Sequence, residues 1–228
     1  MNAHFNPTRS RILRSVFALI ALTWSSIACC GEIHDAAERG DLEEIKALLK
    51  NHPDLVSSKD SSGQTPLIVA ASKGHTAVVA LLVAKGSDVN AAEKAGMTPL
   101  HIAAINGYKE VAEMLLDGRA NVNAWNIYSG MTPLHMAAFK GHKNVAELLL
   151  ASNAEVNGED KEGHTPLYFA ALGEHKDVAE LLLTHFADVN AKDKEGHTPL
   201  FFVKARSYFG DSTAAQIVEL LTQHGGHE

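Results

Sequence analysis

Residues 98–123 read TPLHIAAINGYKEVAEMLLDGRANVN, and residues 132–157 read TPLHMAAFKGHKNVAELLLASNAEVN. The tripeptide that opens both stretches occurs five times at spacings of 33 or 34 residues, as Thr65-Pro66-Leu67, Thr98-Pro99-Leu100, Thr132-Pro133-Leu134, Thr165-Pro166-Leu167 and Thr198-Pro199-Leu200. A fixed period of this length predicts a stack of equal structural units. Each unit cannot bury its apolar face alone, so neighbours must cover it.

The residues of one unit predict two short helices and a loop. Thr98 suits the position before a helix, because its hydroxyl accepts a backbone N–H, and Pro99 at the first helical position loses no hydrogen bond. The small pair Ala103-Ala104 lets neighbouring helices approach closely. Gly107 suits a left-handed helix end, and Leu115-Leu116 form the buried ridge of a second helix. The unit is therefore helix, tight turn, helix and a loop that leads to the next Thr.

The sequence Thr-Pro-Leu-His-x-Ala at residues 98–103 and 132–137 resembles the ankyrin repeat, which also has a length of 33 residues. The resemblance covers residues 31–228. It implies an all-α solenoid of stacked helix-turn-helix units with β-hairpin fingers between them. We expect six repeats: an N-terminal cap at 31–63, four internal repeats at 64–196 and a C-terminal cap at 197–228.

The two predicted caps differ from the internal repeats where a solvent-facing end requires it. Residues 31–63 lack Thr-Pro-Leu and carry a charged helix surface that includes Glu38, Arg39 and Asp41. At the other end, Val203-Lys204 replaces the alanine pair of the internal repeats. A lysine is tolerated there if no further repeat packs on it.

Residues 1–30 form a different kind of sequence. Three arginines precede an apolar segment at 15–24, and small residues lead to Cys29-Cys30. This pattern predicts a signal peptide that is too short to span a membrane as a helix. Cys29 could be a lipidation site, as in a bacterial lipoprotein, although Ser26 replaces the usual Leu; ordinary cleavage before Gly31 is the alternative. A mitochondrial transit peptide is the second interpretation of the segment.

Charge and motifs exclude several classes of function. Without the three arginines of residues 1–30, the chain has 17 Lys and Arg against 27 Asp and Glu, a net charge of −10. A nucleic-acid-binding surface would need a basic face. The histidines recur at equivalent places in successive repeats, about 8–10 Å apart, which is too far for shared zinc ligation. We expect no cofactor, no metal, no catalytic residues and no small-molecule substrate. The resemblance to ankyrin repeats implies that the His after Leu is structural.

Positions that vary between repeats predict where a partner binds. In the ankyrin family, contacts usually come from the finger tip, the residue before Thr-Pro-Leu and the two residues after the alanine pair. These positions become apolar in the middle of the chain, at Met97, Ile105, Trp125, Ile127, Tyr128, Met131, Phe139 and Leu172. Aromatic residues and Met are enriched at protein interfaces. The alternative is that Met131 and Phe139 fill gaps between helices.

The function expected from these features is a non-catalytic protein-binding scaffold, monomeric and exported. It would reside in the periplasm or be lipid-anchored to the cell envelope, with secretion as the alternative. The competing functions are an inhibitor or immunity-type binder of an exported enzyme, and an envelope protective factor under oxidative stress; an enzyme is a distant third.

We also expect Gly173 to take the left-handed position where Glu174 replaces the glycine of other repeats.

Overall fold

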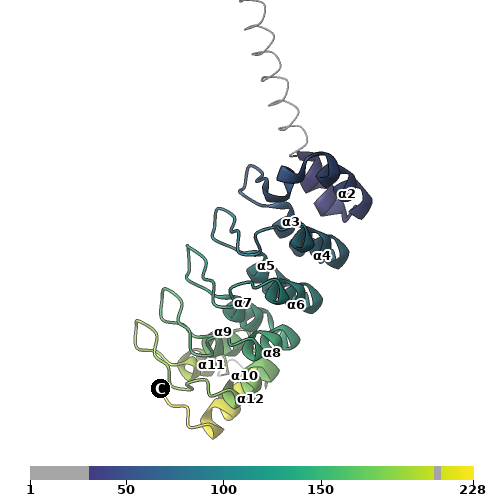
Figure 1. Cartoon of the computed structure of the whole chain (residues 1–228). Coiled ribbons are helices and arrows are strands. Elements are labelled where there is room, and N and C mark those ends of the chain that lie inside the picture. The colour runs from purple at the N-terminus through teal and green to yellow at the C-terminus, as the bar shows by residue number, and fades with distance from the viewer. Residues whose placement is uncertain (1–30, 208–211) are drawn as a thin grey trace, which may run out of the picture.

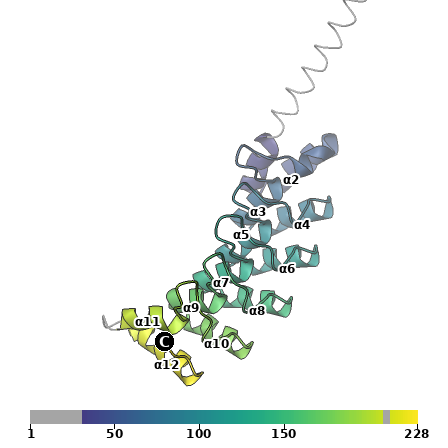
Figure 2. The same cartoon turned by 90° about the vertical axis from the view of Figure 1, so that its left-hand side faces the viewer.

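The computed structural model describes residues 31–207 and 212–228 as a single curved stack of helix pairs (Figures 1 and 2). A helical segment at 31–39 is followed by α2 (Leu42–Asn51), η1 (Pro53–Ser57), α3 (Pro66–Lys73), α4 (Thr76–Ala84), α5 (Pro99–Asn106), α6 (Lys109–Asp117), α7 (Pro133–Lys140), α8 (Lys143–Ala151), α9 (Pro166–Leu172), α10 (Lys176–Thr184), α11 (Pro199–Ser207) and α12 (Ser212–Gln223). The prediction of an all-α solenoid is confirmed. None of the helices in these residues is long and apolar enough to cross a membrane.

Two rows of helices and one row of loops build the stack. In Figure 1, α3, α5, α7, α9 and α11 form the row beside the loops, and α4, α6, α8 and α10 form the outer row. The alanine pairs of the inner row are buried, so these helices lie close together; the pairs are Ala70-Ala71, Ala103-Ala104, Ala137-Ala138 and Ala170-Ala171. One leucine of each outer helix is completely buried, namely Leu82, Leu115, Leu149 and Leu182.

The Thr-Pro start of the inner helices forms as predicted. Thr98 is the N-cap of α5, and Pro99 is its first residue. The Thr98 N–H donates to Nδ1 of His101 at 3.2 Å, and the His101 N–H donates to Oγ1 of Thr98 at 3.4 Å. Two of the unpaired N–H groups at this helix end are therefore satisfied by side chains.

Gly107 and Gly141 end inner helices for two reasons. Both have φ of +73°, the left-handed region that glycine adopts without strain. A Cβ at Gly141 would also lie 2.4 Å from Nδ1 of His175, and one at Gly107 would lie 2.6 Å from Nδ1 of His142. The His175 ring reaches back across this space, and its Nε2 donates to the carbonyl oxygen of Phe139 at 3.0 Å. Glycine thus makes room for a hydrogen bond between adjacent repeats.

The expectation for Gly173 is wrong. Gly173 has φ of −80°, and Glu174 itself takes the left-handed conformation with φ of +60°. Helix α9 ends at Leu172, and a Cβ at Gly173 would lie 2.7 Å from the His175 ring. Gly173 is therefore required for space, and the chain accepts the left-handed residue one position later.

The loops of the stack contain no β-strands within the described residues, so the expected β-hairpin fingers are short turns instead. The fourth finger, at residues 158–164, is closed by a backbone hydrogen bond from Asp160 N to His164 O at 2.9 Å, and Gly163 N donates to Asp160 O at 3.1 Å within the turn. The Asp160 carboxylate accepts two more backbone N–H groups, from Glu162 and His164. Side-chain capping replaces the backbone ladder that a strand pair would need.

Each finger is also bonded to the next one. Lys94 N donates to Ser62 O at 3.3 Å, Ile127 N to Ala95 O at 3.1 Å, Lys161 N to Ser129 O at 2.8 Å and Lys194 N to Glu162 O at 3.0 Å. The fingers therefore form a continuous hydrogen-bonded row along one side of the stack (Figure 1).

In four successive repeats an asparagine joins the repeat to the following one. Asn157 donates from Nδ2 to the carbonyl oxygen of Phe186 at 3.3 Å and accepts from the N–H of Asp188 at 2.8 Å. Asn90, Asn123 and Asn190 make the equivalent pair of bonds. We call this arrangement the asparagine clamp. It explains why the dipeptide Val-Asn recurs in the sequence, at residues 89–90, 122–123, 156–157 and 189–190.

The C-terminal segment completes the last repeat. It is bonded to residues on the loop side, because Asn190 Nδ2 donates to the carbonyl oxygen of Gly225 at 3.1 Å and Thr198 Oγ1 donates to the carbonyl oxygen of His227 at 2.8 Å. Lys204 forms an ion pair with Glu228 at 2.7 Å, and Val203 beside it is buried.

Candidate protein-binding surface

The third finger is longer and more apolar than the others. Asn126 N bonds to Met131 O across five residues, whereas Glu93 N bonds to Met97 O across four in the preceding finger. The longer turn holds Ile127 and Tyr128, whose side chains are 49% and 72% exposed. The turn is fixed from inside by the buried Asn126, whose Oδ1 accepts hydrogen bonds from the N–H and the hydroxyl of Ser129. Two large apolar side chains are thus presented to solvent on a defined turn.

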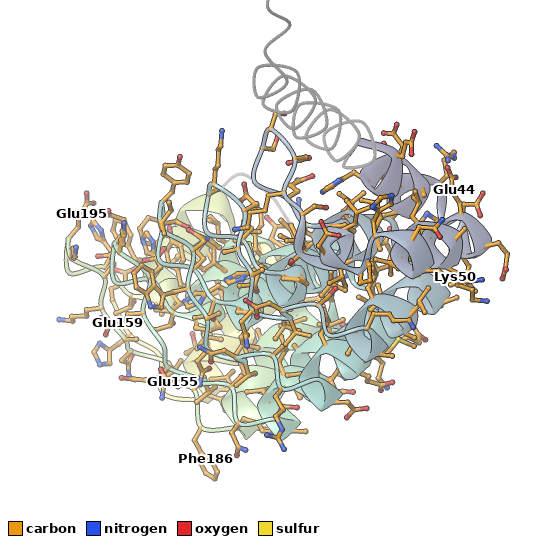
Figure 3. All side chains as sticks on the ribbon, turned by 45° about the horizontal axis from the view of Figure 1, so that its top comes forward. Glu44, Lys50, Glu155, Glu159, Phe186 and Glu195 are labelled. Atoms are coloured by element: carbon orange, nitrogen blue, oxygen red, sulfur yellow. The ribbon has the colours of Figure 1, made fainter. Side chains whose placement is uncertain are left out.

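Trp125 lies just before this turn, at the edge of a groove between the third and fourth fingers. Its side chain is 61% exposed. The groove has a volume of about 290 Å³ and is lined by Asn123, Trp125, Gly130, Thr132, Glu155, Gly158, Glu159, Asp160 and Lys161. Glu155 and Glu159 lie on the loop side of the stack, away from Glu44 and Lys50 of α2 (Figure 3). We call this site the Trp125 groove.

Phe139 belongs to a second apolar group, on the inner helices. Its ring is 38% exposed and meets the edge of the Phe169 ring at a centroid distance of 6.0 Å. Phe169 also makes edge contacts with His135, His164 and Tyr168. Phe139 therefore both faces solvent and packs on the next repeat.

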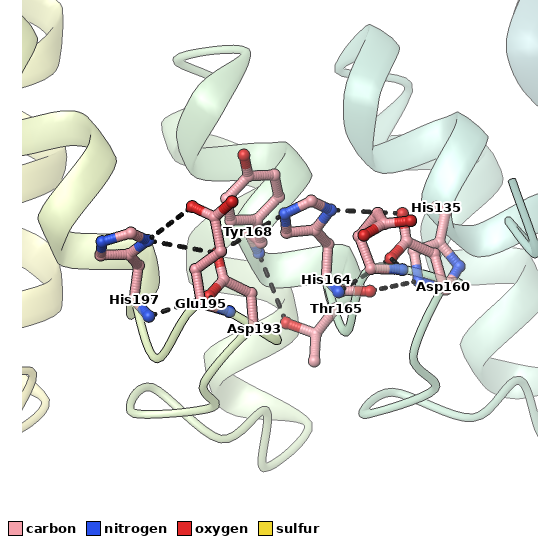
Figure 4. Close-up of polar contacts among 9 residues, drawn as sticks. His135, Asp160, His164, Thr165, Tyr168, Asp193, Glu195 and His197 are labelled. Atoms are coloured by element: carbon pink, nitrogen blue, oxygen red, sulfur yellow. Dashed lines mark hydrogen bonds and ion pairs between the residues drawn. The ribbon is translucent and has the colours of Figure 1, made fainter.

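Rings and carboxylates alternate along the inner side of the last repeats (Figure 4). The His164 ring stacks on Tyr168 at 3.9 Å and lies between two carboxylates, with Nδ1 at 3.3 Å from Asp160 Oδ2 and Nε2 at 3.7 Å from Asp193 Oδ2. The arrangement recurs one repeat later, where His197 stacks on Phe201 and faces Asp193 at 3.7 Å. Burial, with the nearby Asp193 charge as a further cause, raises the pKa of Tyr168.

The structure divides the predicted apolar strip into three environments. Trp125, Ile127 and Tyr128 are exposed on and beside the third finger. Met97, Ile105 and Met131 are only partly exposed, because they pack against the core. Phe139 is between these cases, and Leu172 is partly exposed at the end of α9. The gap-filling alternative therefore describes Met131 well and Phe139 in part.

Several exposed or partly exposed aromatic residues escaped the sequence-based prediction. Phe169 meets the Phe139 ring and Phe201 stacks on His197, and Phe186 is 88% exposed just after α10. The sequence contained one hint about Phe186, because Gly86 occupies the same place in an earlier repeat and glycine is typical of a left-handed backbone. In the structure Arg119, Asn153 and Phe186, which share this place, all have positive φ.

The histidines after Leu are structural, as the resemblance implied. His101 and His135 are completely buried and donate from Nε2 to the carbonyl oxygens of Met131 and His164 at 3.0 and 3.1 Å. Burial lowers the pKa of His101 to about 4, and burial likewise lowers the pKa of His135. Nδ1 of each ring accepts a threonine N–H, so the neutral Nε2–H form fits both sites.

Two of the chemical expectations concern metal ligands and Cys29. Among the described residues no group of three or more His, Cys, Asp or Glu side chains is placed to hold a metal ion. The proposed lipidation site Cys29 and the whole segment 1–30 lie outside the described residues.

Comparison with known proteins finds short matches to long eukaryotic chains. The 60 kDa lysophospholipase of Mus musculus is 51% identical over 51 residues, which are 22% of this chain and 9% of that protein. Ankyrin repeat domain-containing protein 35 of Homo sapiens is 39% identical over 57 residues, 25% of this chain and 6% of that protein. Protein ACCELERATED CELL DEATH 6 of Arabidopsis thaliana is 48% identical over 52 residues, 23% of this chain and 8% of that protein. The chain thus covers less than a tenth of each relative.

A family model gives the broader match. The model described as "Ankyrin repeats (3 copies)" matches residues 33–126, 93–160, 119–193 and 155–227. Together these overlapping matches extend across nearly all of the described stack. Ankyrin repeats indicate a protein–protein interaction domain, and the fold is typically a non-catalytic binding scaffold. The enzyme-named lysophospholipase matches only a short stretch. The chain belongs to the ankyrin-repeat family.

Proposed function

We propose that this protein is a non-catalytic scaffold that binds a partner protein through the third finger and the surface around it. The observation that carries the proposal is the exposure of Trp125, Ile127 and Tyr128 together, on a turn that Asn126 holds in shape. Exposed aromatic residues on a rigid support lose little conformational entropy on binding and contribute most to interfaces. The partly exposed Phe139, Ile105, Met97, Met131 and Leu172 extend this surface.

Site-specific crosslinking tests the proposal. A photoreactive amino acid is placed at Tyr128 of the full chain in its native host, and the crosslinked product is identified by mass spectrometry. We expect one protein to be crosslinked from Tyr128, and the crosslink to be lost in Trp125→Ala. The matched control position is Ser72, which is polar and lies at the end of α3. An identical product from Ser72, or none from Tyr128, would contradict the proposal.

We also propose that the protein is exported and works in the cell envelope. Support comes from the three arginines, the apolar segment 15–24 and the small residues before Cys29. The mature chain would begin at Cys29, with a lipid anchor, or at Gly31. The intact mass of protein extracted from the envelope, with and without Cys29→Ser, tests both forms. A species that retains Met1 would contradict export.

Two functions of the binding are compatible with this proposal. The scaffold could inhibit an exported enzyme, or it could protect a partner under oxidative stress. Activity of the crosslinked partner, measured with and without the scaffold, separates them: inhibition lowers the activity directly, whereas protection preserves it only after exposure to peroxide.

A further inference from the structure

We propose that the Trp125 groove receives a basic side chain, arginine or lysine, from the partner. The inference rests on the proposed function and adds the chemistry of the contact. Trp125 supplies an exposed indole ring, and Glu155 and Glu159 supply carboxylates in the same groove. Cations bind over the face of Trp more strongly than over other rings, and carboxylates attract the same charge. A planar guanidinium is suited to both contacts at once.

Two departures from the repeat pattern meet at this groove. Trp125 stands where other repeats have Lys59, Ala92, Glu159 and Lys192, and Gly158 stands where they have Ala91, Ala124 and Ala191. A Cβ at Gly158 would lie 3.3 Å from the carbonyl oxygen of Glu155 and in van der Waals contact with its Oε2, at 3.7 Å. Glycine therefore leaves more space beside the Glu155 carboxylate, in the groove that Trp125 also lines.

Some charged groups of the groove already bond to other protein groups, and others are exposed to solvent. The Asp160 carboxylate is almost fully buried and accepts hydrogen bonds within the fourth finger. Lys161, the basic residue of the lining, donates from Nζ to the carbonyl oxygen of Ile127. Glu155 and Glu159 are exposed and form no ion pair within the described residues. They are the carboxylates available to a cation from outside.

The rest of the chain favours the same partner charge. Residues 31–228 carry a net charge of −10, obtained from 20 Lys and Arg less the three in residues 1–30, against 27 Asp and Glu. Such a surface attracts basic partners over a distance, and the groove offers one place where the attraction becomes a specific contact.

The indole signal of Trp125 reports on the site directly. The chain contains two tryptophans, so the full-length Trp24→Phe variant leaves Trp125 as the sole indole N–H in an NMR spectrum. The probe is an end-blocked peptide Gly-Gly-Arg-Gly-Gly, and the control peptide carries neutral citrulline in place of arginine. We expect a saturable shift of the Trp125 signal with the arginine peptide and roughly tenfold weaker binding of the citrulline peptide.

Variants can distinguish a specific effect of the groove carboxylates from an effect of the overall negative charge. Glu155→Gln with Glu159→Gln should weaken the arginine peptide roughly tenfold, and Gly158→Ala, which restores the residue of other repeats, should weaken it several-fold. Glu110→Gln with Asp117→Asn removes the same charge from α6 and should change binding by less than about twofold. Equal binding of both peptides, or equal weakening by both double variants, would overturn the inference.

The two proposals fail in different ways. If the groove does not recognise a cation, the Tyr128 crosslink to the partner persists in the Glu155→Gln, Glu159→Gln variant. If the protein is not a binding scaffold at this finger, the Tyr128 crosslink is missing from the parent chain as well.

Discussion

His101 and Met131 lie 30 residues apart in the sequence, and a hydrogen bond of 3.0 Å from Nε2 of the imidazole to the carbonyl oxygen of Met131 joins them. The bond ties the first turn of α5 to the base of the third finger, which carries the exposed aromatic residues. A buried structural histidine therefore supports the proposed binding surface from beneath.

The buried histidines predict a loss of stability in mild acid. The folded-state pKa of His101 is lowered from 6.5 to about 4, so its contribution is complete above pH 6.5 and is lost as the pH falls toward 4. Between pH 7 and pH 5, protonation linked to His101 should lower the free energy of unfolding by about 2 kcal/mol. Urea unfolding at each pH measures this quantity. His101→Gln keeps a neutral hydrogen-bonding group and should flatten the curve by that amount.

Removal of one asparagine clamp should weaken the stack. Asn90→Ala loses the bonds to the Arg119 carbonyl and the Asn121 N–H, and we expect the free energy of unfolding to fall by about 1–2 kcal/mol. Asn106→Ala is the matched control, because the amide of Asn106 bonds only within its own helix, to Ile102. Equal losses in both variants would show that the clamp between repeats has no special role.

Phe186 should be a site where glycine stabilises the protein. The residue is almost fully exposed and has φ of +64°, so its ring contributes little packing while its Cβ is strained. Phe186→Gly should raise the free energy of unfolding by about 0.5–1 kcal/mol, since Gly86 takes this place in an earlier repeat. Phe186→Ala retains the strain and should change stability little. Thermal unfolding of the three proteins compares them.

Trp125 and Phe139 should separate binding from stability. Trp125→Ala is expected to weaken partner binding by about 2–4 kcal/mol with little effect on unfolding, because the ring lies outside the core. Phe139→Ala should weaken binding and also lower stability by about 1–2 kcal/mol, since its ring packs on Phe169. Ser72→Ala should shift affinity by less than about 1 kcal/mol. Calorimetric titration and urea unfolding of each variant give the two quantities, and unchanged affinity in Trp125→Ala would contradict the proposed surface.

The sequence was sufficient for the helices and their burial pattern. Thr-Pro marks each inner helix start, and the spacing of the copies fixes which face of each helix is buried. It was insufficient where a residue's role depends on atoms that only the fold brings beside it. The role of Gly173 is visible only beside the His175 ring and the Phe139 carbonyl oxygen of the preceding repeat, and the turns of the fingers depend on carboxylates such as Asp160. Trp125 was identified as unusual, but its groove depends on Gly158 of the following loop.

The hydrogen-bonded row of fingers has a consequence for how fast a partner associates. Lys161 N to Ser129 O and Ile127 N to Ala95 O hold the third finger to both neighbours. The distance between the third and fourth fingers is therefore set before any partner arrives, and no slow rearrangement needs to precede docking. We expect a single association phase whose observed rate rises linearly with partner concentration, with a rate constant of about 10⁵–10⁷ M⁻¹s⁻¹.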